Sequence, residues 1–171
     1  MMLTPLFTSP LDTAIGLERT TCQLIDVEVK DGEYVFGFEK LKRWIDLCKK
    51  CGIEYFEMSH LFSQWGAKYA PKVVATVNGK KEKIFGWHTP AVGEYTKFLE
   101  SFLPQLTAKL REWGIADATY FHISDEPREE HLESYKAAKE SLGNMLDGFH
   151  TFDALSSYEF YRHGLIDKPV P

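Results

Sequence analysis

Two adjacent acids, Asp125 and Glu126, are the residues in this chain best suited to chemistry. They follow the run TYFHIS and precede Pro127, so we place them at the carboxyl end of a strand, just before the first turn of a helix. Neighbouring carboxylates repel, and one ionised acid favours the protonated form of the other, which can then donate a proton. We predict a catalytic pair of carboxyl groups. Helix capping and pairing with surface lysines are the alternatives.

Candidate binding residues follow the second predicted strand, in the segment MSHLFSQWGAK. There, His60 and Lys68 are suited to hydrogen-bond sugar hydroxyls, and Trp65 to stack on a pyranose ring. Loop packing is the alternative for Trp65, and plain solvation is the alternative for Lys68. Trp87 follows a predicted hairpin beside His88 and is assigned to substrate binding, with a structural role as its alternative.

Two further candidates lie at strand ends. His122 has the same parity as Glu126 along its strand, so we predict that it lines the interior near the acid. A hydrogen-bonded interior histidine without a functional role is the alternative. Asp153 ends the fourth predicted strand and is predicted to bind a sugar hydroxyl or to cap the following helix. His131, Tyr135 and His163 fall on helices and are assigned no function.

A metal-dependent hydrolase is a weaker alternative for these strand ends. The potential ligands near them are His60, His122, His150, Asp125 and Asp153. However, the sequence contains no HxH or HExxH spacing, and a divalent site needs several convergent ligands. It also contains no glycine-rich phosphate loop and no GxSxG nucleophile motif. We therefore predict no metal and no cofactor.

Four strand–helix units follow one another and must position these residues. The strands are predicted at residues 2–8, 53–59, 118–124 and 149–155. The helices are predicted at residues 38–51 and 94–113, then across Leu132, Tyr135 and Leu142, and finally up to His163. Pro104 predicts a kink or a restart in the second helix, while Gly52 and Gly114 are the predicted ends of the first two helices.

Two β-hairpins are predicted, each between a strand and the next helix. One covers residues 23–38 and turns at the Asp-Gly pair 31–32, and the other covers residues 72–87 and turns at the Asn-Gly pair 78–79. Strands that alternate with helices predict an α/β fold with a parallel sheet. Long insertions between a strand and the next helix, together with short connections from a helix to the next strand, favour a (β/α)8 TIM barrel with a catalytic face.

The chain has 171 residues, whereas such a barrel needs about 250. Its last stretch, GLIDKPVP, is interpreted as the approach to a fifth strand. We therefore predict one domain over residues 1–171 that forms about half a barrel and is truncated after residue 171. A complete flavodoxin-like open sheet is the alternative. Open strand edges would favour a homodimer.

Composition excludes several classes of partner. Apolar residues make up 44% of the chain and charged residues 26%, as in globular proteins, and the net charge of −5 comes without a basic stripe. We expect neither nucleic acid nor membrane as a partner. The start, MMLTPLFTSPLD, lacks a signal-peptide pattern, and the three cysteines provide no disulfide framework, so a cytoplasmic location is predicted.

Four blocks of sequence carry a family resemblance: TPLFTSPLDT, WGAKYAPKVVATVNG, IFGW and FHISDEP. Together they resemble the catalytic barrel of glycoside hydrolase family 123 and the related proteins grouped as domain of unknown function 4091, over nearly the whole chain. The resemblance implies a carbohydrate substrate and cleavage of terminal β-linked N-acetylgalactosamine. It also implies a retaining, substrate-assisted mechanism, in which the acetamido oxygen of the substrate attacks the anomeric carbon.

The same resemblance implies a role for each acid. Asp125 would hold the acetamido N–H and stabilise the oxazolinium-like positive charge. Glu126 would protonate the leaving oxygen and then activate water. The alternative function is a non-catalytic carbohydrate-binding or structural barrel segment, inactive because half of the barrel is absent.

Overall fold

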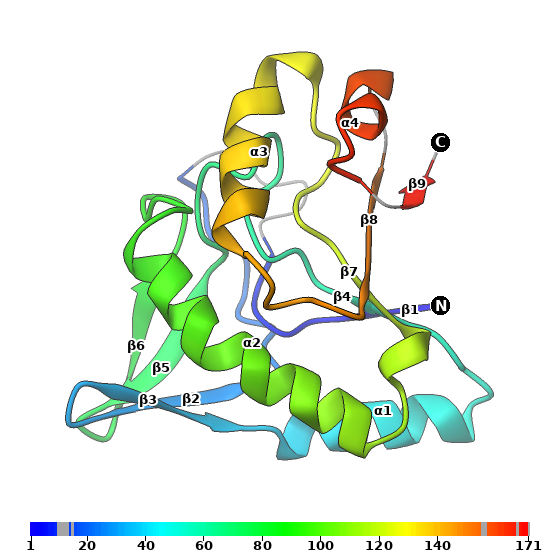
Figure 1. The fold of residues 1–171 in the computed structure, drawn as a ribbon. Helices are drawn as coiled ribbons and strands as arrows, with labels where there is room; N and C mark the ends of the chain where they lie inside the picture. Colours follow the sequence, from blue (N-terminus) through cyan, green and yellow to red (C-terminus); the bar gives the residue numbers. More distant parts are fainter. Residues whose placement is uncertain (10–13, 15, 155–156, 167, 171) are drawn as a thin grey trace.

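The computed structural model describes residues 1–9, 14, 16–154, 157–166 and 168–170. Within them, five parallel strands form a first sheet in the order β1, β4, β7, β8 and β9 (Figure 1). Their bounds are β1 Met2–Thr4, β4 Phe56–Met58, β7 Thr119–Phe121, β8 His150–Ala154 and β9 Lys168–Val170. Residues 10–13 of the first family-like block, and Leu155 at the predicted end of the fourth strand, lie outside the described residues.

Helices separate these strands along the chain. The α-helices of the described residues are α1 Glu39–Lys50, α2 Glu94–Glu112, α3 Leu132–Ser141 and α4 Tyr158–Arg162. The 3₁₀ turns η1 Ala116–Ala118 and η2 Glu129–His131 precede β7 and α3. The alternation confirms the predicted α/β class. Because the strands lie in chain order, the sheet differs from the 2-1-3-4-5 order of the flavodoxin-like alternative.

The strands of the first sheet are shorter than predicted. β1 ends just before Pro5, because proline has no N–H to donate to the ladder. Thr8, the predicted end of this strand, instead forms an isolated antiparallel bridge with Lys72. Likewise β4 and β7 stop before His60 and His122, so both histidines lie in the segments that follow the carboxyl ends of their strands.

One face of the first sheet is covered and the other is partly open. Phe56 and Phe121 are fully buried on the covered face. Their neighbours Leu3, Glu57 and Tyr120 are in register with one another across β1, β4 and β7, and they point to the opposite face because strand side chains alternate. Leu3 is 40% exposed there. The open face therefore carries both apolar and charged side chains.

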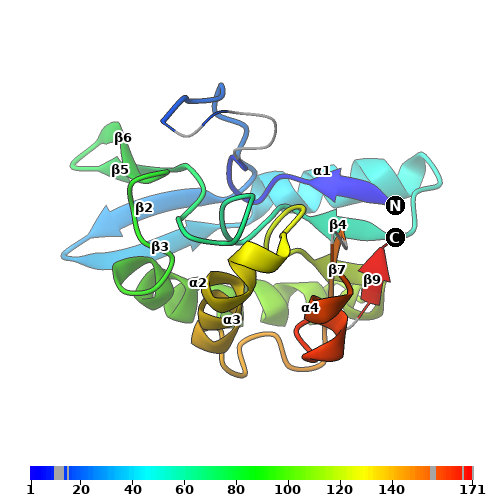
Figure 2. The ribbon, with the colours of Figure 1, turned by 90° about the horizontal axis from the view of Figure 1, so that it is seen from above.

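Both predicted hairpins are confirmed, and they pair with each other, which the sequence did not predict. The first consists of β2 Asp26–Lys30 and β3 Glu33–Gly37, and the second of β5 Val73–Val77 and β6 Lys80–Phe85. β2 lies parallel to β5, so the hairpins form a second sheet in the order β3, β2, β5, β6 (Figure 2).

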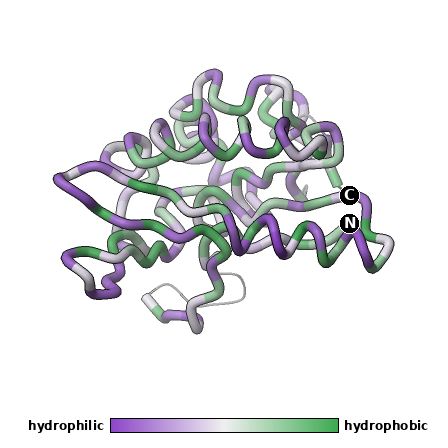
Figure 3. Tube along the Cα trace, turned by 90° about the horizontal axis from the view of Figure 1, so that it is seen from below, coloured by the Kyte–Doolittle hydropathy of each residue, from purple (hydrophilic) through white to green (hydrophobic). Residues whose placement is uncertain are grey.

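The turns and one glutamine fix this second sheet. Both residues of each turn, 31–32 and 78–79, have positive φ, the conformation of the tight turn that favours Asp or Asn followed by Gly. The turns are hydrophilic (Figure 3). The side-chain amide of Gln23 donates to the carbonyl oxygens of Ile25 (2.7 Å) and Val74 (2.9 Å) and accepts from the N–H of Val74 (3.0 Å). Gln23 therefore joins the two hairpins.

α2 packs against both sheets and carries much of the core. Its Phe98 and Phe102 rings lie 5.5 and 5.1 Å from the ring of Phe36 on β3. The same two rings lie 5.5 and 5.0 Å from Phe7, which follows β1. Phe98 and Phe102 are fully buried, and each such burial stabilises the fold by about 1.5–3 kcal/mol. This aromatic cluster holds the hairpin sheet beside the parallel sheet.

The predicted helices are present, and one of them contains Pro104. α2 continues through Pro104, so the restart that was one of the two predicted outcomes does not occur. Pro104 is exposed, and so is Glu100, whose carbonyl loses its partner, so water can satisfy that carbonyl. Gly52 and Gly114 adopt positive φ just past α1 and α2, as predicted. Within the described residues, no helix combines the length and the apolar character needed to cross a membrane.

Candidate active site

His122 lies between two carboxyl groups at the carboxyl edge of the first sheet. Its Nδ1 is 2.8 Å from Oδ1 of Asp153 on β8, and its Nε2 is 2.7 Å from Oε1 of Glu57 on β4. A neutral imidazole has a single N–H, so the ring donates to both carboxylates only when both nitrogens carry protons. His122 therefore faces the interior, as predicted, and it does so as a cation.

The pKa of His122 reflects two opposing effects. Burial disfavours the charged ring, but the hydrogen bonds to Asp153 and Glu57 outweigh burial and raise the pKa of His122 to about 9. The ring is thus an imidazolium at neutral pH. A positive charge is thus held in the interior between two carboxyl groups.

Asp153 is fully buried and holds His122 from one side. Its Oδ2 accepts hydrogen bonds from the hydroxyl of Tyr135 on α3 and from the N–H of Ser124 (3.3 Å). Burial raises the pKa of Asp153, and the hydrogen bonds from His122 and then Tyr135 oppose that rise. Capping, one of the alternatives for Asp153, does not occur, because Ser157 is the residue that caps α4.

His60 stacks on His122 from the segment that follows β4. The two ring centroids are 4.3 Å apart. His60 is 5% exposed, and neither of its ring nitrogens finds a hydrogen-bond partner within the described parts of the chain. Burial, and then the charge on His122, hold the pKa of His60 well below its usual range, so this ring is neutral. Its Nε2 lies 3.9 Å from Oδ1 of Asp125, which is too long for a hydrogen bond.

Asp125 connects this interior cluster to the surface. Its side chain is 30% exposed and its carboxyl group adjoins His60, while its backbone carbonyl accepts a hydrogen bond from the N–H of Trp65 at 3.0 Å. Glu126 follows with an exposed side chain and a φ of 42°. This left-handed conformation is uncommon outside glycine, and such residues cluster at functional sites. The pair thus lies past the end of β7, where strand alternation no longer dictates the direction of each side chain.

A cavity of about 370 Å³ lies beside this segment and gathers three predicted binding residues, Trp65, Lys68 and Trp87. The rest of its lining consists of Ser63, Gln64, Tyr69, Arg128, Glu130 and His131. Asp125 and Glu126 are not part of this lining. Trp65 is 38% exposed, whereas Trp87 is 8% exposed. Aromatic rings and hydrogen-bonding groups therefore share one concave surface, the composition expected of a small-molecule site.

A strained turn shapes the wall of this cavity. Trp65, Gly66 and Ala67 have φ values of 56°, 105° and 54°. A Cβ at position 66 would lie 2.8 Å from the Cβ of His131, so only glycine allows this close approach. The turn after β4 is thereby pressed against η2, which follows the acid pair.

The interior cluster also contains potential metal ligands. One ligand atom from each of His60, His122 and Asp153 lies within 4.8 Å of the others. Both nitrogens of His122 already face carboxyl groups, so a metal ion would have to displace a proton and an Asp153 or Glu57 contact. As placed, this donor set fits a proton better than a metal. His150, another potential ligand from sequence, is exposed on β8 and stacks on Tyr120, with a 5.2 Å centroid distance.

Six of the predicted site residues thus fall into two groups: His60, His122 and Asp153 in the interior, and Trp65, Lys68 and Trp87 around the cavity. Asp125 adjoins the interior group through His60, whereas the exposed Glu126 belongs to neither group. Two residues to which the sequence assigned no function belong to these groups, since Tyr135 binds Asp153 and His131 lines the cavity. Sequence reasoning also missed Glu57 and Arg128. A signal for Glu57 existed, because a charged residue inside the strand IEYFEMS needs a partner when the strand packs into a sheet.

Comparisons with known proteins identify the family of the chain and its fold. Residues 1–171 match the family model described as Glycoside hydrolase 123, catalytic domain. A search of curated proteins finds no match. Among solved structures, a family 123 glycoside hydrolase from Clostridium perfringens, analysed for the details of glycolipid glycan hydrolysis, is similar with a TM-score of 0.68 and 16% identity.

Because the sequence identity is only 16%, this structural similarity shows the fold alone. It covers 98% of this chain and 29% of the other, so this chain spans less than a third of the length of that protein. The family assignment comes from the family model, which matches the chain from its first residue to its last. The chain therefore belongs to the family described as Glycoside hydrolase 123, catalytic domain.

Proposed function

We propose that this chain carries the acid pair of a retaining, substrate-assisted β-N-acetylhexosaminidase that removes terminal β-linked N-acetylgalactosamine. Asp125 orients the 2-acetamido group and stabilises the positive charge of the oxazolinium-like intermediate. Glu126 protonates the leaving oxygen and then activates water. The observation that carries the proposal is the position of Asp125, whose carboxyl group adjoins buried His60 while its carbonyl binds the backbone of Trp65 on the cavity wall.

The interior cluster supports this division of labour. Neutral His60 has an N–H and a free ring nitrogen, both buried, and its Nε2 is 3.9 Å from the Asp125 carboxyl group. In this proposal, the N–H of His60 hydrogen-bonds the Asp125 carboxylate when the sugar is bound and fixes it towards the acetamido group. His60 stacks on His122, which Asp153 holds in turn. In this proposal, His122 and Asp153 therefore position His60 and do not contact the sugar.

The cavity supports a saccharide as the ligand. Its volume of about 370 Å³ falls in the range of about 300–1,000 Å³ found for small-molecule sites. The exposed ring of Trp65 offers a face for a pyranose, and Trp87 closes the same cavity. Lys68 and Arg128 provide donors for sugar hydroxyls. Each of these groups comes from a segment that follows a parallel strand or the second hairpin.

We further propose that the first sheet is about half of a (β/α)8 barrel. The order of the strands, which follows the chain, supports this. The open face with Leu3, Glu57 and Tyr120 also supports it, because in a closed barrel side chains from the opposite strands would cover that face. The strands that complete it come from further residues of the same protein or from a second copy of this chain. Light scattering distinguishes these, because a monodisperse monomer excludes the second copy.

Hydrolysis of 4-nitrophenyl N-acetyl-β-D-galactosaminide by the full-length protein tests the catalytic proposal. Glu126→Gln and Asp125→Asn are each expected to lower kcat by roughly 100-fold or more. Glu129→Gln, which removes a nearby exposed acid in η2, is the matched control and is expected to keep the wild-type rate. The corresponding 4-nitrophenyl β-D-galactoside lacks the acetamido nucleophile and is expected to resist hydrolysis.

Other outcomes assign other functions. Activity that a chelator abolishes would favour a metal bound at the cluster of His60, His122 and Asp153. Folded full-length protein that binds methyl N-acetyl-β-D-galactosaminide but hydrolyses neither aryl glycoside would favour a non-catalytic binding domain. Equal rates on the two aryl glycosides would contradict the substrate-assisted mechanism while leaving a glycosidase.

A further inference from the structure

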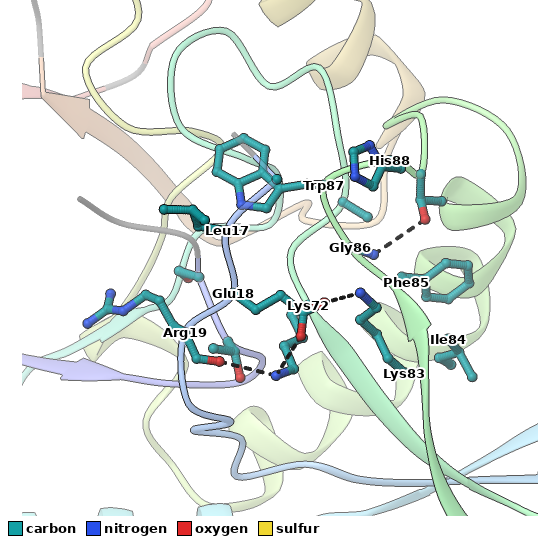
Figure 4. A pocket seen from close by; sticks show the side chains of 15 residues that line it. Leu17, Glu18, Arg19, Lys72, Lys83, Ile84, Phe85, Gly86, Trp87 and His88 are labelled. Carbon is teal, nitrogen blue, oxygen red and sulfur yellow. Dashed lines mark hydrogen bonds and ion pairs between the residues drawn. The ribbon is translucent and has the colours of Figure 1, made fainter. Parts of the chain in front are cut away.

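A second cavity, of about 140 Å³, also has Trp87 in its wall (Figure 4). It is formed by the segment after β1, the residue before β5, the end of β6 and the loop that follows. Its volume is well above the roughly 10–15 Å³ that a single water molecule needs. It has room for a substituent on a sugar rather than for an extended chain.

The charges that line this cavity are predominantly positive. Among the described lining residues, Arg19, Lys72 and Lys83 are cationic and Glu18 is the acid. The Glu18 carboxylate contacts Lys83 and, at 3.3 Å, Lys72. The hydrogen bonds from Lys83 and then Lys72 lower the pKa of Glu18, so it stays ionised between the two ammonium groups. One carboxylate thus balances only one of three cations, and the surplus favours an anionic ligand.

A buried hydroxyl group in the lining lacks a partner. Ser9 lines the cavity and is 8% exposed, and its Oγ makes no hydrogen bond within the described residues. Buried hydroxyl groups are nearly always hydrogen-bonded, because an unmet donor or acceptor destabilises the interior. A carboxylate oxygen of a ligand would accept from this hydroxyl while its charge meets Lys72 and Lys83.

We propose that this cavity binds the carboxylate of an acidic sugar, as part of a saccharide that also occupies the cavity of Trp65 and Lys68. Trp87 lines both cavities, so the two cavities adjoin at this residue. The proposal rests on the proposed saccharide function and narrows its substrate class to acidic glycans. The neutral sugar lies near Asp125, and the acidic sugar lies near Lys83.

Calorimetric titration with two probes tests this assignment. Methyl β-D-galacturonide carries the carboxylate, and methyl β-D-galactoside is its neutral counterpart. The wild-type protein is expected to bind the galacturonide at least about tenfold more tightly, with the difference shrinking at high salt. Lys83→Gln is expected to weaken galacturonide binding by about tenfold, as for the loss of one charge-assisted hydrogen bond. Lys81→Gln removes the same charge from an exposed position of β6 outside the cavity and is expected to change nothing.

Three results would overturn the proposal. Two of them are equal affinity for both sugars and equal effects of the Lys83 and Lys81 substitutions on galacturonide binding. The third is inorganic sulfate binding as tightly as the galacturonide, which would show a general anion site. Lys72→Gln replaces Lys83→Gln if thermal unfolding shows that the latter is not folded. Hydrolysis of the neutral aryl galactosaminide is measured on the same wild-type sample. Hydrolysis without galacturonide binding would reject the acidic subsite alone, whereas galacturonide binding without hydrolysis would reject the catalytic proposal alone.

Discussion

His122 and Asp153 are 31 residues apart in the chain, yet Nδ1 of the histidine lies 2.8 Å from Oδ1 of the aspartate. The other ring nitrogen of His122 contacts Glu57 at 2.7 Å. Glu57 belongs to β4, His122 follows β7 and Asp153 belongs to β8, so one imidazolium ties three neighbouring strands together at the edge that carries the site. The protonation of this ring should therefore be coupled to the stability of the fold.

We expect the free energy of unfolding to fall between pH 6.5 and 9. The pKa of His122 in the folded protein is about 9, above the usual histidine value near 6.5, so the folded state binds this proton more tightly than the unfolded state. The resulting stabilisation is complete below about pH 6.5 and is lost as the pH rises through about 9. Its full size is on the order of 3 kcal/mol. Urea unfolding at pH 6, 7, 8 and 9 measures it.

His122→Asn is the variant that isolates this effect. It removes the titrating ring, so its unfolding free energy should change less than that of the wild type between pH 6.5 and 9. An unchanged slope in this variant would mean that other groups cause the loss.

His60 acts in the opposite sense, because its pKa is lowered, and its contribution is lost as the pH falls below about 6.5.

Tyr135→Phe is expected to lower the free energy of unfolding by about 1–3 kcal/mol. The substitution keeps the buried ring but leaves Oδ2 of the fully buried Asp153 without its hydroxyl donor. Tyr161→Phe, on the exposed side of α4, is the matched control and should stay within about 0.5 kcal/mol of the wild type. Urea unfolding at pH 7 compares the two. Equal stability would show that the hydroxyl contributes no net stabilisation.

Gly66→Ala should be more damaging than Gly52→Ala. Both glycines have positive φ, so both substitutions introduce backbone strain of about 1–2 kcal/mol. A Cβ at position 52 meets nothing within 4 Å, whereas a Cβ at position 66 would lie 2.8 Å from the Cβ of His131. Overpacking of this kind costs about 1–3 kcal/mol more. Thermal unfolding of the two variants measures the difference, and equal losses would mean that the turn relaxes away from His131.

Local elements could be predicted from the sequence because their signals are local. The Asp-Gly and Asn-Gly pairs specified both hairpin turns, and apolar residues at helical spacing located α1 and α2. The parallel pairing of β2 with β5 has no such signal, because it joins segments about 50 residues apart and depends on Gln23 and the aromatic rings of α2. The strands of the first sheet were overestimated in length because apolar residues continue past their ends as core of the following segments.

For the candidate site, too, the sequence could predict individual residues but not the contacts between elements. Position at strand ends made Asp125, His122 and Asp153 candidates, since polar residues that follow buried strands gather at one edge of a parallel sheet. Their division into an interior cluster and a cavity could not be inferred, because it depends on contacts between elements. Glu57 and Tyr135 approach His122 and Asp153 from another strand and from a helix, and no spacing within one segment encodes such a contact.

Trp65→Ala is expected to weaken binding of methyl N-acetyl-β-D-galactosaminide by about tenfold with little loss of stability. The Trp65 ring is 38% exposed on the cavity wall, so its removal takes away a stacking surface worth about 1 kcal/mol or more while opening no cavity in the core. Trp65→Phe keeps an aromatic face and should lose less.

Tyr161→Ala removes an exposed aromatic ring elsewhere and should leave binding unchanged. Titration calorimetry, with thermal unfolding of each variant, separates the two effects. Unaltered affinity in Trp65→Ala would place the sugar outside this cavity, because no other exposed tryptophan lines it among the described residues.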